Sequence, residues 1–252
     1  MDAYEKRVLV LADEIIKCGS DVVCLQECFH VDAYHLLKSN LQRHGVYKYF
    51  HNDALRVPFY NGNSGLCVIS KYPIENVVFN TFTASSHVDT LSHKGFLCCD
   101  VVSPTHTLTV CNTHLQSDYP LAHYDSVRKQ QIAQLVAYMV KRHTHNPCIV
   151  CGDWNIDMNS KEFSQQLCPL LSDAFTDIRI YNDKKYKSKH GYTHSDGHID
   201  YFFVIPGKHT TKHASVYNTL RLFQNMHYTH SDHKMIRLIH SDRHTRKCIN
   251  TL

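Results

Sequence analysis

Five short polar clusters follow one another along the chain, each where a predicted strand ends. Apolar runs precede the first four of them, the fourth more weakly than the others. The clusters are residues 25–27, 112–116, 151–155, 199–201 and 231–233. Carboxylate, amide and imidazole groups at the ends of buried strands are costly unless they converge on one site, where they can pair or bind a metal. We therefore expect the five clusters to form a single site.

The order of these clusters resembles the endonuclease/exonuclease/phosphatase superfamily of metal-dependent phosphodiesterases, over about residues 4–240. That superfamily has two packed β-sheets flanked by helices, with the active site at one end between the sheets. The resemblance implies an α/β (α+β) fold class: a four-layer α/β/β/α sandwich of two mixed β-sheets in one domain, residues 1–252. It also implies Mg²⁺, with Mn²⁺ as the alternative. One or two carboxylates can hold Mg²⁺ beside a substrate phosphate.

Two of the clusters are expected to bind the metal and the attacking water. Glu27 ends Leu25-Gln26-Glu27, which matches the family's metal-binding strand end, although a glutamate can also simply leave a strand into solvent. Asp153 and Asn155 match the family's Gly-Asp-x-Asn signature. There the Asp orients or deprotonates water and the Asn amide donates to a phosphoryl oxygen. The alternative is an ordinary Asp/Asn turn.

The last two clusters are expected to supply a carboxylate–imidazole pair. A hydrogen bond from His233 to Asp200 raises the basicity of the imidazole and leaves its other nitrogen free to take a proton from water. Either His233 or Asp153 can be the general base, and the sequence leaves this open. Asp232 is a candidate second or outer metal ligand.

His114 is the second candidate imidazole, and the resemblance gives it the role of stabilising the phosphoryl group in the transition state. The sequence shows no carboxylate partner for it. A solitary histidine at the end of a strand is more often a structural residue.

The segments between the clusters look most like neutral sphingomyelinases, which cleave sphingomyelin to ceramide and phosphocholine. The matching segments include residues 63–74 and 93–96, and Arg128-x-x-Gln131. Lys94 is a candidate ligand of the lipid phosphate, or else a solvated lysine before a strand. The expected partner is a phospholipid, with peripheral membrane contact, and the expected state is a monomer. A nuclease of the same superfamily and an inactive, truncated binding module remain alternatives.

Periodicity predicts the elements that position these clusters. The helices are expected from residue 4 to Gly19, over 33–41 until Gly45, over 124–142 and near 161–167. Further strands are expected at about 65–70, 77–83, 95–102, 107–113, 148–151, 200–205 and 234–239. The family's first strand, which carries a metal-site Asn, has no counterpart ahead of the first helix. We therefore expect a metal site one ligand short, or Asn112 as the substitute, and an exposed sheet edge.

Composition favours one intracellular domain. The chain has 252 residues, 43% of them hydrophobic, and a net charge of +4 that is thin for binding along a nucleic-acid duplex. Many of its 11 cysteines lie in apolar runs typical of strands, which favours thiols rather than disulfides and a reducing compartment. Because the first residues are charged, we expect no signal peptide, and no apolar stretch reaches the ~18 residues that span a membrane. The expected location is the cytoplasm.

Overall fold

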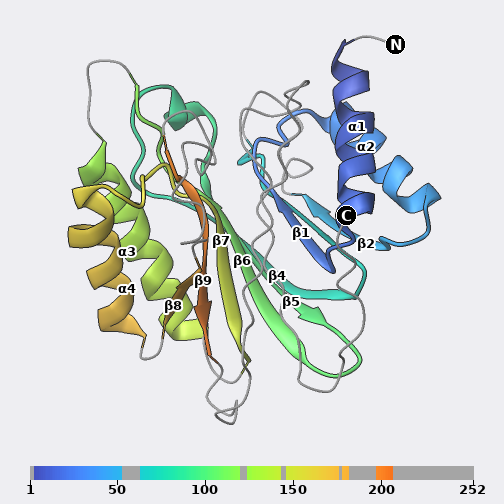
Figure 1. Ribbon diagram of the computed structural model, residues 1–252. Helices are drawn as coiled ribbons and strands as arrows, with labels where there is room; N and C mark the ends of the chain where they lie inside the picture. Colours follow the sequence, from blue (N-terminus) through green and yellow to red (C-terminus); the bar gives the residue numbers. More distant parts are fainter. Residues whose placement is uncertain are drawn as a thin grey trace.

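The layers of the molecule are a helical layer, two β-sheets and a second helical layer (Figure 1). The computed structural model describes residues 3–52, 63–119, 124–142, 146–175, 178–181 and 197–206. The predicted four-layer sandwich is confirmed. Asp232, His233 and the strand predicted at 234–239 lie outside the described residues.

The first half of the chain builds the smaller sheet and the helices that cover it. Its strands, all antiparallel, lie in the order β1-β3-β2. The elements are α1 (Ala3–Cys18), β1 (Val22–Leu25), α2 (Val31–Arg43), β2 (Tyr49–Asn52) and β3 (Cys67–Ser70). Buried residues of α1 and α2, such as Ile15 and Leu41, pack on Ile69 of β3. One face of each helix covers this sheet and is apolar, which accounts for the amphipathic pattern of both helices.

The larger sheet has six strands in the order β4-β5-β6-β7-β9-β8. They are β4 (Ile74–Thr81), β5 (Gly95–Val102), β6 (Thr107–His114), β7 (Cys148–Asp153), β8 (Arg179–Tyr181) and β9 (Asp200–Ile205). Only β6 and β7 are parallel among these pairs, and α3 (Asp125–Arg142) connects them. The remaining elements are the 3₁₀ helix η2 (His87–Leu91), a π-helical turn, η3 (Phe163–Leu167), and α4 (Cys168–Ala174).

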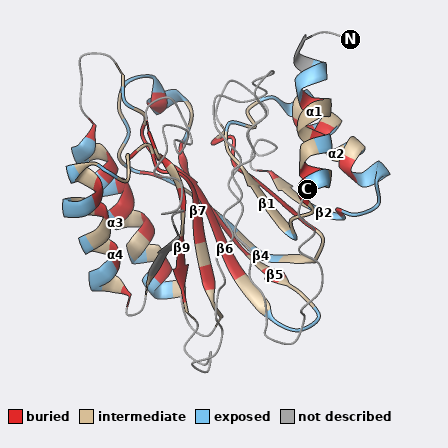
Figure 2. Ribbon diagram, in the orientation of Figure 1, coloured by how far each residue is buried: buried red, intermediate tan, exposed pale blue. Residues whose placement is uncertain are grey.

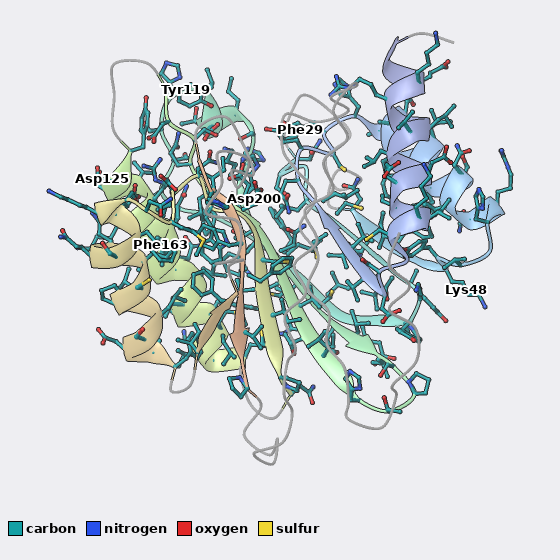
Figure 3. The ribbon with its side chains drawn as sticks, viewed as in Figure 1. Phe29, Lys48, Tyr119, Asp125, Phe163 and Asp200 are labelled. Carbon is teal, nitrogen blue, oxygen red and sulfur yellow. A yellow bond between two sulfur atoms is a disulfide. The ribbon has the colours of Figure 1, made fainter. Side chains whose placement is uncertain are left out.

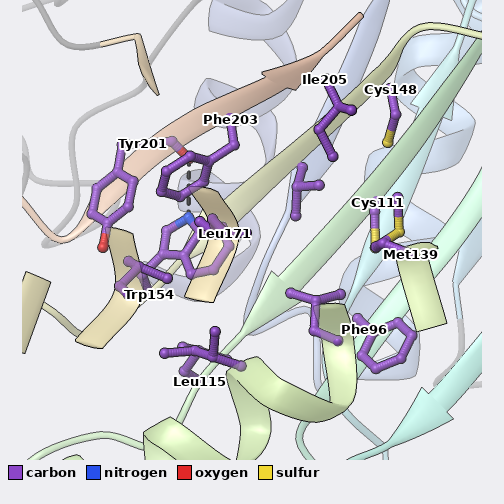
Figure 4. Close-up of a cluster of buried hydrophobic side chains, with 14 of the residues drawn as sticks. Phe96, Cys111, Leu115, Met139, Cys148, Trp154, Leu171, Tyr201, Phe203 and Ile205 are labelled. Carbon is purple, nitrogen blue, oxygen red and sulfur yellow. Dashed lines mark hydrogen bonds between the residues drawn. The ribbon is translucent and has the colours of Figure 1, made fainter. Parts of the chain in front are cut away.

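The central strands β5, β6, β7 and β9 are largely buried on both faces, as the red segments in Figure 2 show, whereas the edge strand β4 is not. On the face covered by α3 and α4, Trp154 stacks on Tyr201 with ring centroids 5.5 Å apart and donates from Nε1 to the Tyr201 carbonyl at 3.1 Å (Figure 4). The opposite face packs on the smaller sheet through residues such as Val110 and Cys151. Since side chains alternate along a strand, residues 112 and 114 of β6 and 153 of β7 also point between the sheets.

Asn112 joins the two sheets by hydrogen bonds. Its side chain is fully buried, and Nδ2 donates to the carbonyls of Leu25 at 2.9 Å and Cys67 at 3.1 Å. Oδ1 accepts a bond from Nε2 of Gln26 at 2.6 Å. Both amide hydrogens of Asn112 are thus used between β6 and the strands β1 and β3, so the structure gives it an inter-sheet role.

The expectation of thiols throughout was wrong for one pair of cysteines. Cys98 and Cys111 form a disulfide, because they lie directly opposite each other on β5 and β6 with Cα atoms 4.1 Å apart. Sequence spacing alone does not reveal this register. The other described cysteines are free.

Among the described helices, none combines the length and the apolar character that crossing a bilayer requires.

Replacing Asn112 tests whether its hydrogen bonds between the sheets stabilise the protein. Asn112→Leu keeps a similar volume but removes two hydrogen bonds to main-chain carbonyls and one from Gln26, so we expect a loss of about 3 kcal/mol in the free energy of unfolding. The measurement is urea denaturation. The control is Asn40→Ala, which removes one bond to the Leu36 carbonyl within α2 and is expected to cost at most about 1 kcal/mol. Equal stability of the two variants would contradict this role.

Candidate active site

Three predicted site residues stand side by side on neighbouring strands. His114 ends β6 and lies opposite Asp153, the last residue of β7. Asp153 in turn lies opposite Asp200, the first residue of β9. Residues paired directly across a sheet project to the same face, so all three side chains point toward the smaller sheet. Figure 3 shows Asp200 at this end of the larger sheet, with Phe29 on the facing side.

His114 has the carboxylate partner that the sequence did not show. Its Nε2 lies 3.5 Å from Oδ2 of Asp153, and both side chains are almost completely buried. This is an electrostatic contact somewhat longer than an ordinary hydrogen bond. The partner comes from a strand that is distant in sequence, and only the parallel pairing of β6 with β7 brings the two together.

The turn after β7 fixes Asp153 and Asn155. Gly152 has φ of +143°, and a Cβ there would overlap the main chain of Thr113, so only glycine fits. Oδ1 of Asp153 accepts from the amide of Asn155 at 2.8 Å, the hydrogen bond of an Asx turn. The other carboxylate oxygen remains directed at His114. Asn155 has φ of +50° and donates from Nδ2 to the Leu115 carbonyl at 3.0 Å, which leaves its second amide hydrogen for another acceptor.

Glu27 follows β1 and is exposed, on the smaller sheet's side of the site. Its φ of +57° is uncommon for a residue other than glycine, and such conformations cluster at functional sites. The Cys28 amide donates to the Gly65 carbonyl at 2.8 Å, and a Cβ on Gly65 would lie 2.9 Å from the Cα of Glu27. The surrounding main chain therefore fixes Glu27.

Lys94 is buried rather than solvated. Its Nζ donates to the Leu115 carbonyl at 2.8 Å and to Ser117 Oγ at 2.7 Å, and pairs with Oδ2 of Asp89 at 2.8 Å. Burial lowers the pKa of Lys94, while the charges of Asp89, Asp153 and Glu27 act to raise it. The charges that act on this ammonium group thus include carboxylates from both sheets, Glu27 and Asp153. All three N–H donors of Lys94 already have protein acceptors in this structure. A role of Lys94 in binding the lipid phosphate stays a prediction.

Asp89 was missed by sequence reasoning. It lies on η2 and is buried, and besides Lys94 it accepts from the Ser117 amide at 2.8 Å and the Tyr119 hydroxyl at 2.6 Å. In the sequence, Asp89 belongs to no predicted strand and to none of the five polar clusters. Its partners follow β6, 28 and 30 residues later.

Of the two residues predicted to bind the metal, Glu27 and Asp232, only Glu27 lies within the described ranges. No group of three or more His, Cys, Asp or Glu side chains suited to a metal occurs there. Mg²⁺ needs fewer, since it keeps several waters and binds through one or two carboxylates. The exposed Glu27 carboxylate fits this chemistry. The roles of Asp232 and of an Asp200–His233 pair stay predictions, because Asp232 and His233 lie outside the described residues.

Comparisons with known proteins agree on one family. The model of the Endonuclease/Exonuclease/phosphatase family matches residues 2–233. Sphingomyelinase C from Listeria ivanovii is 26% identical over 166 residues, which cover 58% of this chain and 48% of that protein. This chain spans between 48% and 67% of the length of several curated relatives.

Two solved structures share the fold. A mutant of beta toxin from Staphylococcus aureus with bound magnesium ions has a TM-score of 0.67 at 20% identity, covering 80% of this chain and 77% of that one. TDP2 from D. rerio complexed with a single-strand DNA product has a TM-score of 0.64 at 17% identity, covering 90% and 88%.

The buried Lys94–Asp89 pair yields a stability prediction. Lys94→Met leaves the Asp89 carboxylate buried without its counter-charge, so we expect a loss of about 3–5 kcal/mol in the free energy of unfolding. The double variant Asp89→Asn/Lys94→Met removes both charges and is expected to regain most of that loss. Denaturant unfolding provides the measurement.

The matched control is Lys71→Met, which breaks a partly exposed pair with Asp21 at 3.0 Å. It is expected to cost no more than about 1 kcal/mol. If Lys94→Met lowered the free energy of unfolding no more than this control, the Lys94–Asp89 ion pair would not stabilise the protein.

Proposed function

The chain belongs to the endonuclease/exonuclease/phosphatase family of hydrolytic phosphodiesterases and phosphatases, and we propose that it is a Mg²⁺-dependent phosphodiesterase acting on sphingomyelin. The products are ceramide and phosphocholine. The observation that carries the proposal is the row His114–Asp153–Asp200 on three adjacent strands, with Glu27 following β1 of the other sheet. The similarity to a sphingomyelinase C supports the lipid substrate.

The proposed mechanism assigns one task to each residue. Asp153, whose Oδ1 is held by its own turn, orients the attacking water. His114 and the second amide hydrogen of Asn155 donate to the phosphoryl oxygens, where charge develops in the transition state. Asp200 orients His233, which takes the proton from water. The choice of His233 rather than Asp153 as the base is part of the proposal.

Glu27 and Asp232 would hold the metal, Mg²⁺ or alternatively Mn²⁺. When bound, it supplies Lewis-acid neutralisation of the phosphoryl charge. The oxygen-only donor set on these two residues suits both ions.

A nuclease is the second candidate, and the similarity to TDP2 with its DNA product favours it. Against it, two basic side chains near the site, Lys94 and Arg128, are buried and already paired with carboxylates. They are therefore committed within the protein and do not add to a basic track for a phosphate backbone. An inactive binding module would show no turnover of any phosphodiester.

A substrate panel with Mg²⁺ tests the proposal. We expect phosphocholine release from sphingomyelin in detergent micelles and none after chelation of the metal. Micelles remove the need for the protein to reach a bilayer, and vesicles of sphingomyelin test that step separately. Cleavage of abasic, nicked or single-stranded DNA without phosphocholine release would establish the nuclease instead.

Glu27→Gln is expected to lower kcat by on the order of 10²-fold or more, because it removes a charged ligand of the metal. The Mg²⁺ concentration for half-maximal activity should rise as well. The control is Glu75→Gln, an exposed glutamate on β4, which should leave both values unchanged. Wild-type activity in Glu27→Gln would remove Glu27 from the metal site.

Gly65→Ala tests whether the main chain around Glu27 sets the metal affinity. A Cβ at Gly65 would lie 2.9 Å from both the Cα of Glu27 and the ring of Phe29, so the contact between residue 65 and the main chain of Glu27 must change. We expect a higher Mg²⁺ requirement in a folded protein, measured by activity against Mg²⁺ concentration. Gly45→Ala is the control, since Gly45 has a similar φ of +72° but no atom within 4 Å of the added Cβ. Identical Mg²⁺ dependence of the two variants would refute the link.

A further inference from the structure

Arg128, in the first turns of α3, is buried and uses all five of its N–H groups. Nε and Nη2 donate to the two carboxylate oxygens of Glu162 at 2.7 and 2.8 Å. Nη1 and Nη2 donate to Asp118 at 2.8 and 3.4 Å, and Nη1 also donates to the Gln116 carbonyl at 3.1 Å. Burial opposes the charge, but the hydrogen bonds to Glu162 and Asp118 outweigh it and raise the pKa of Arg128. The guanidinium therefore stays charged.

The same helix holds the other main-chain group of Gln116. Gln131, three residues after Arg128 and so on the same helix face, accepts from the Gln116 amide at 2.9 Å through Oε1. Its Nε2 donates to the Ala84 carbonyl at 2.8 Å. Both the N–H and the C=O of Gln116 are thus fixed by side chains of α3.

Gln116 follows Leu115, whose main chain connects the site residues. The Leu115 amide donates to the Asp153 carbonyl at 3.0 Å, and its own carbonyl accepts from Asn155 Nδ2 at 3.0 Å. His114 directly precedes Leu115. A displacement of residues 115–116 would therefore move His114 and Asn155 relative to each other.

The two carboxylates on Arg128 belong to the two segments that follow the site strands. Asp118 follows β6, and Glu162 follows the turn that carries Asn155 after β7. We propose that Arg128 is a positioning residue that fixes His114 and Asn155 relative to each other, through Gln116 and Leu115, by binding both segments at once. This rests on the proposed function for its effect on turnover, but not for its effect on the order of residues 114–118.

A lysine cannot replace Arg128 in this role. Its ammonium donates from a single point and has three N–H groups, whereas the observed contacts need a planar group with five. Arg128→Lys therefore preserves the buried charge but not the simultaneous contact with Asp118, Glu162 and the Gln116 carbonyl.

The test compares Arg128→Ala and Arg128→Lys with Arg142→Ala in the substrate that the wild type turns over. Arg142 lies on the same helix, pairs with Asp100 at 3.2 Å, and donates to the Tyr138 hydroxyl and the Asn76 carbonyl at 2.9 Å each. It makes similar contacts at the other end of α3. We expect both Arg128 variants to lose about 10- to 100-fold in kcat with little change in KM, since misplacement affects the reacting geometry. Arg142→Ala should keep the wild-type kcat.

Added guanidinium ion is expected to restore kcat of Arg128→Ala in a saturable manner and to leave Arg142→Ala unchanged. A merely structural role would lower the folded fraction without this selective rescue. If Arg128→Ala does not fold, Arg128→Lys and Glu162→Gln are compared with Arg142→Ala instead. Both substitutions change the hydrogen bonds of Arg128 but leave nearly the same side-chain volume.

Hydrogen exchange separates this inference from the proposed function. Amides of residues 114–118 should exchange faster in the Arg128 variants, while those of β5 should exchange as in wild type. If the wild type turned over no substrate, the proposed function would fail and the exchange result would still decide the positioning role. Unchanged exchange at 114–118, or a kcat loss no larger than that of Arg142→Ala, would overturn the inference.

Discussion

The hydrogen bonds of Asn112 across the two sheets are the contacts on which the site depends. The site lies between the sheets, so Glu27 can face Asp153 only if β1 and β6 keep a fixed relation to each other. Asn112 provides it by donating to Leu25, two residues before Glu27, while standing two residues before His114. A buried amide bonded to main-chain carbonyls is directional, whereas the apolar packing around it is not. Apolar packing holds the sheets together, and the hydrogen bonds of Asn112 fix the position of β1 relative to β6.

A second constraint acts within the larger sheet. The pairing of β6 with β7 and of β7 with β9 places His114, Asp153 and Asp200 in one row. A shift of one residue in either pairing would turn a polar side chain toward the helices and the Trp154 cluster. The buried aromatic packing on that face therefore favours the observed pairing of β6, β7 and β9. The same pairing places the three polar side chains in one row on the other face. Packing and site share the same strands but use alternate residues.

Much of this was predictable because polar residues directly after apolar runs mark strand ends. The bounds of β5 and β9 and the extent of α1 and α3 followed closely from periodicity. Contacts between distant segments did not follow, since each depends on sheet register. The Asp153 partner of His114, the burial of Lys94 by Asp89 and the Cys98–Cys111 disulfide are of this kind. Short elements such as β2, β8 and η2 lack enough residues to show a period.

Asp153 is the residue at which these constraints meet, since it contacts His114, closes the turn to Asn155 and lies opposite Asp200. The most direct measurement is therefore the turnover of sphingomyelin in detergent micelles with Mg²⁺ by Asp153→Asn, alongside its unfolding midpoint. The site as described predicts a fall in kcat of on the order of 10²-fold or more in a folded protein. Near wild-type turnover by a folded Asp153→Asn would show that catalysis takes place elsewhere.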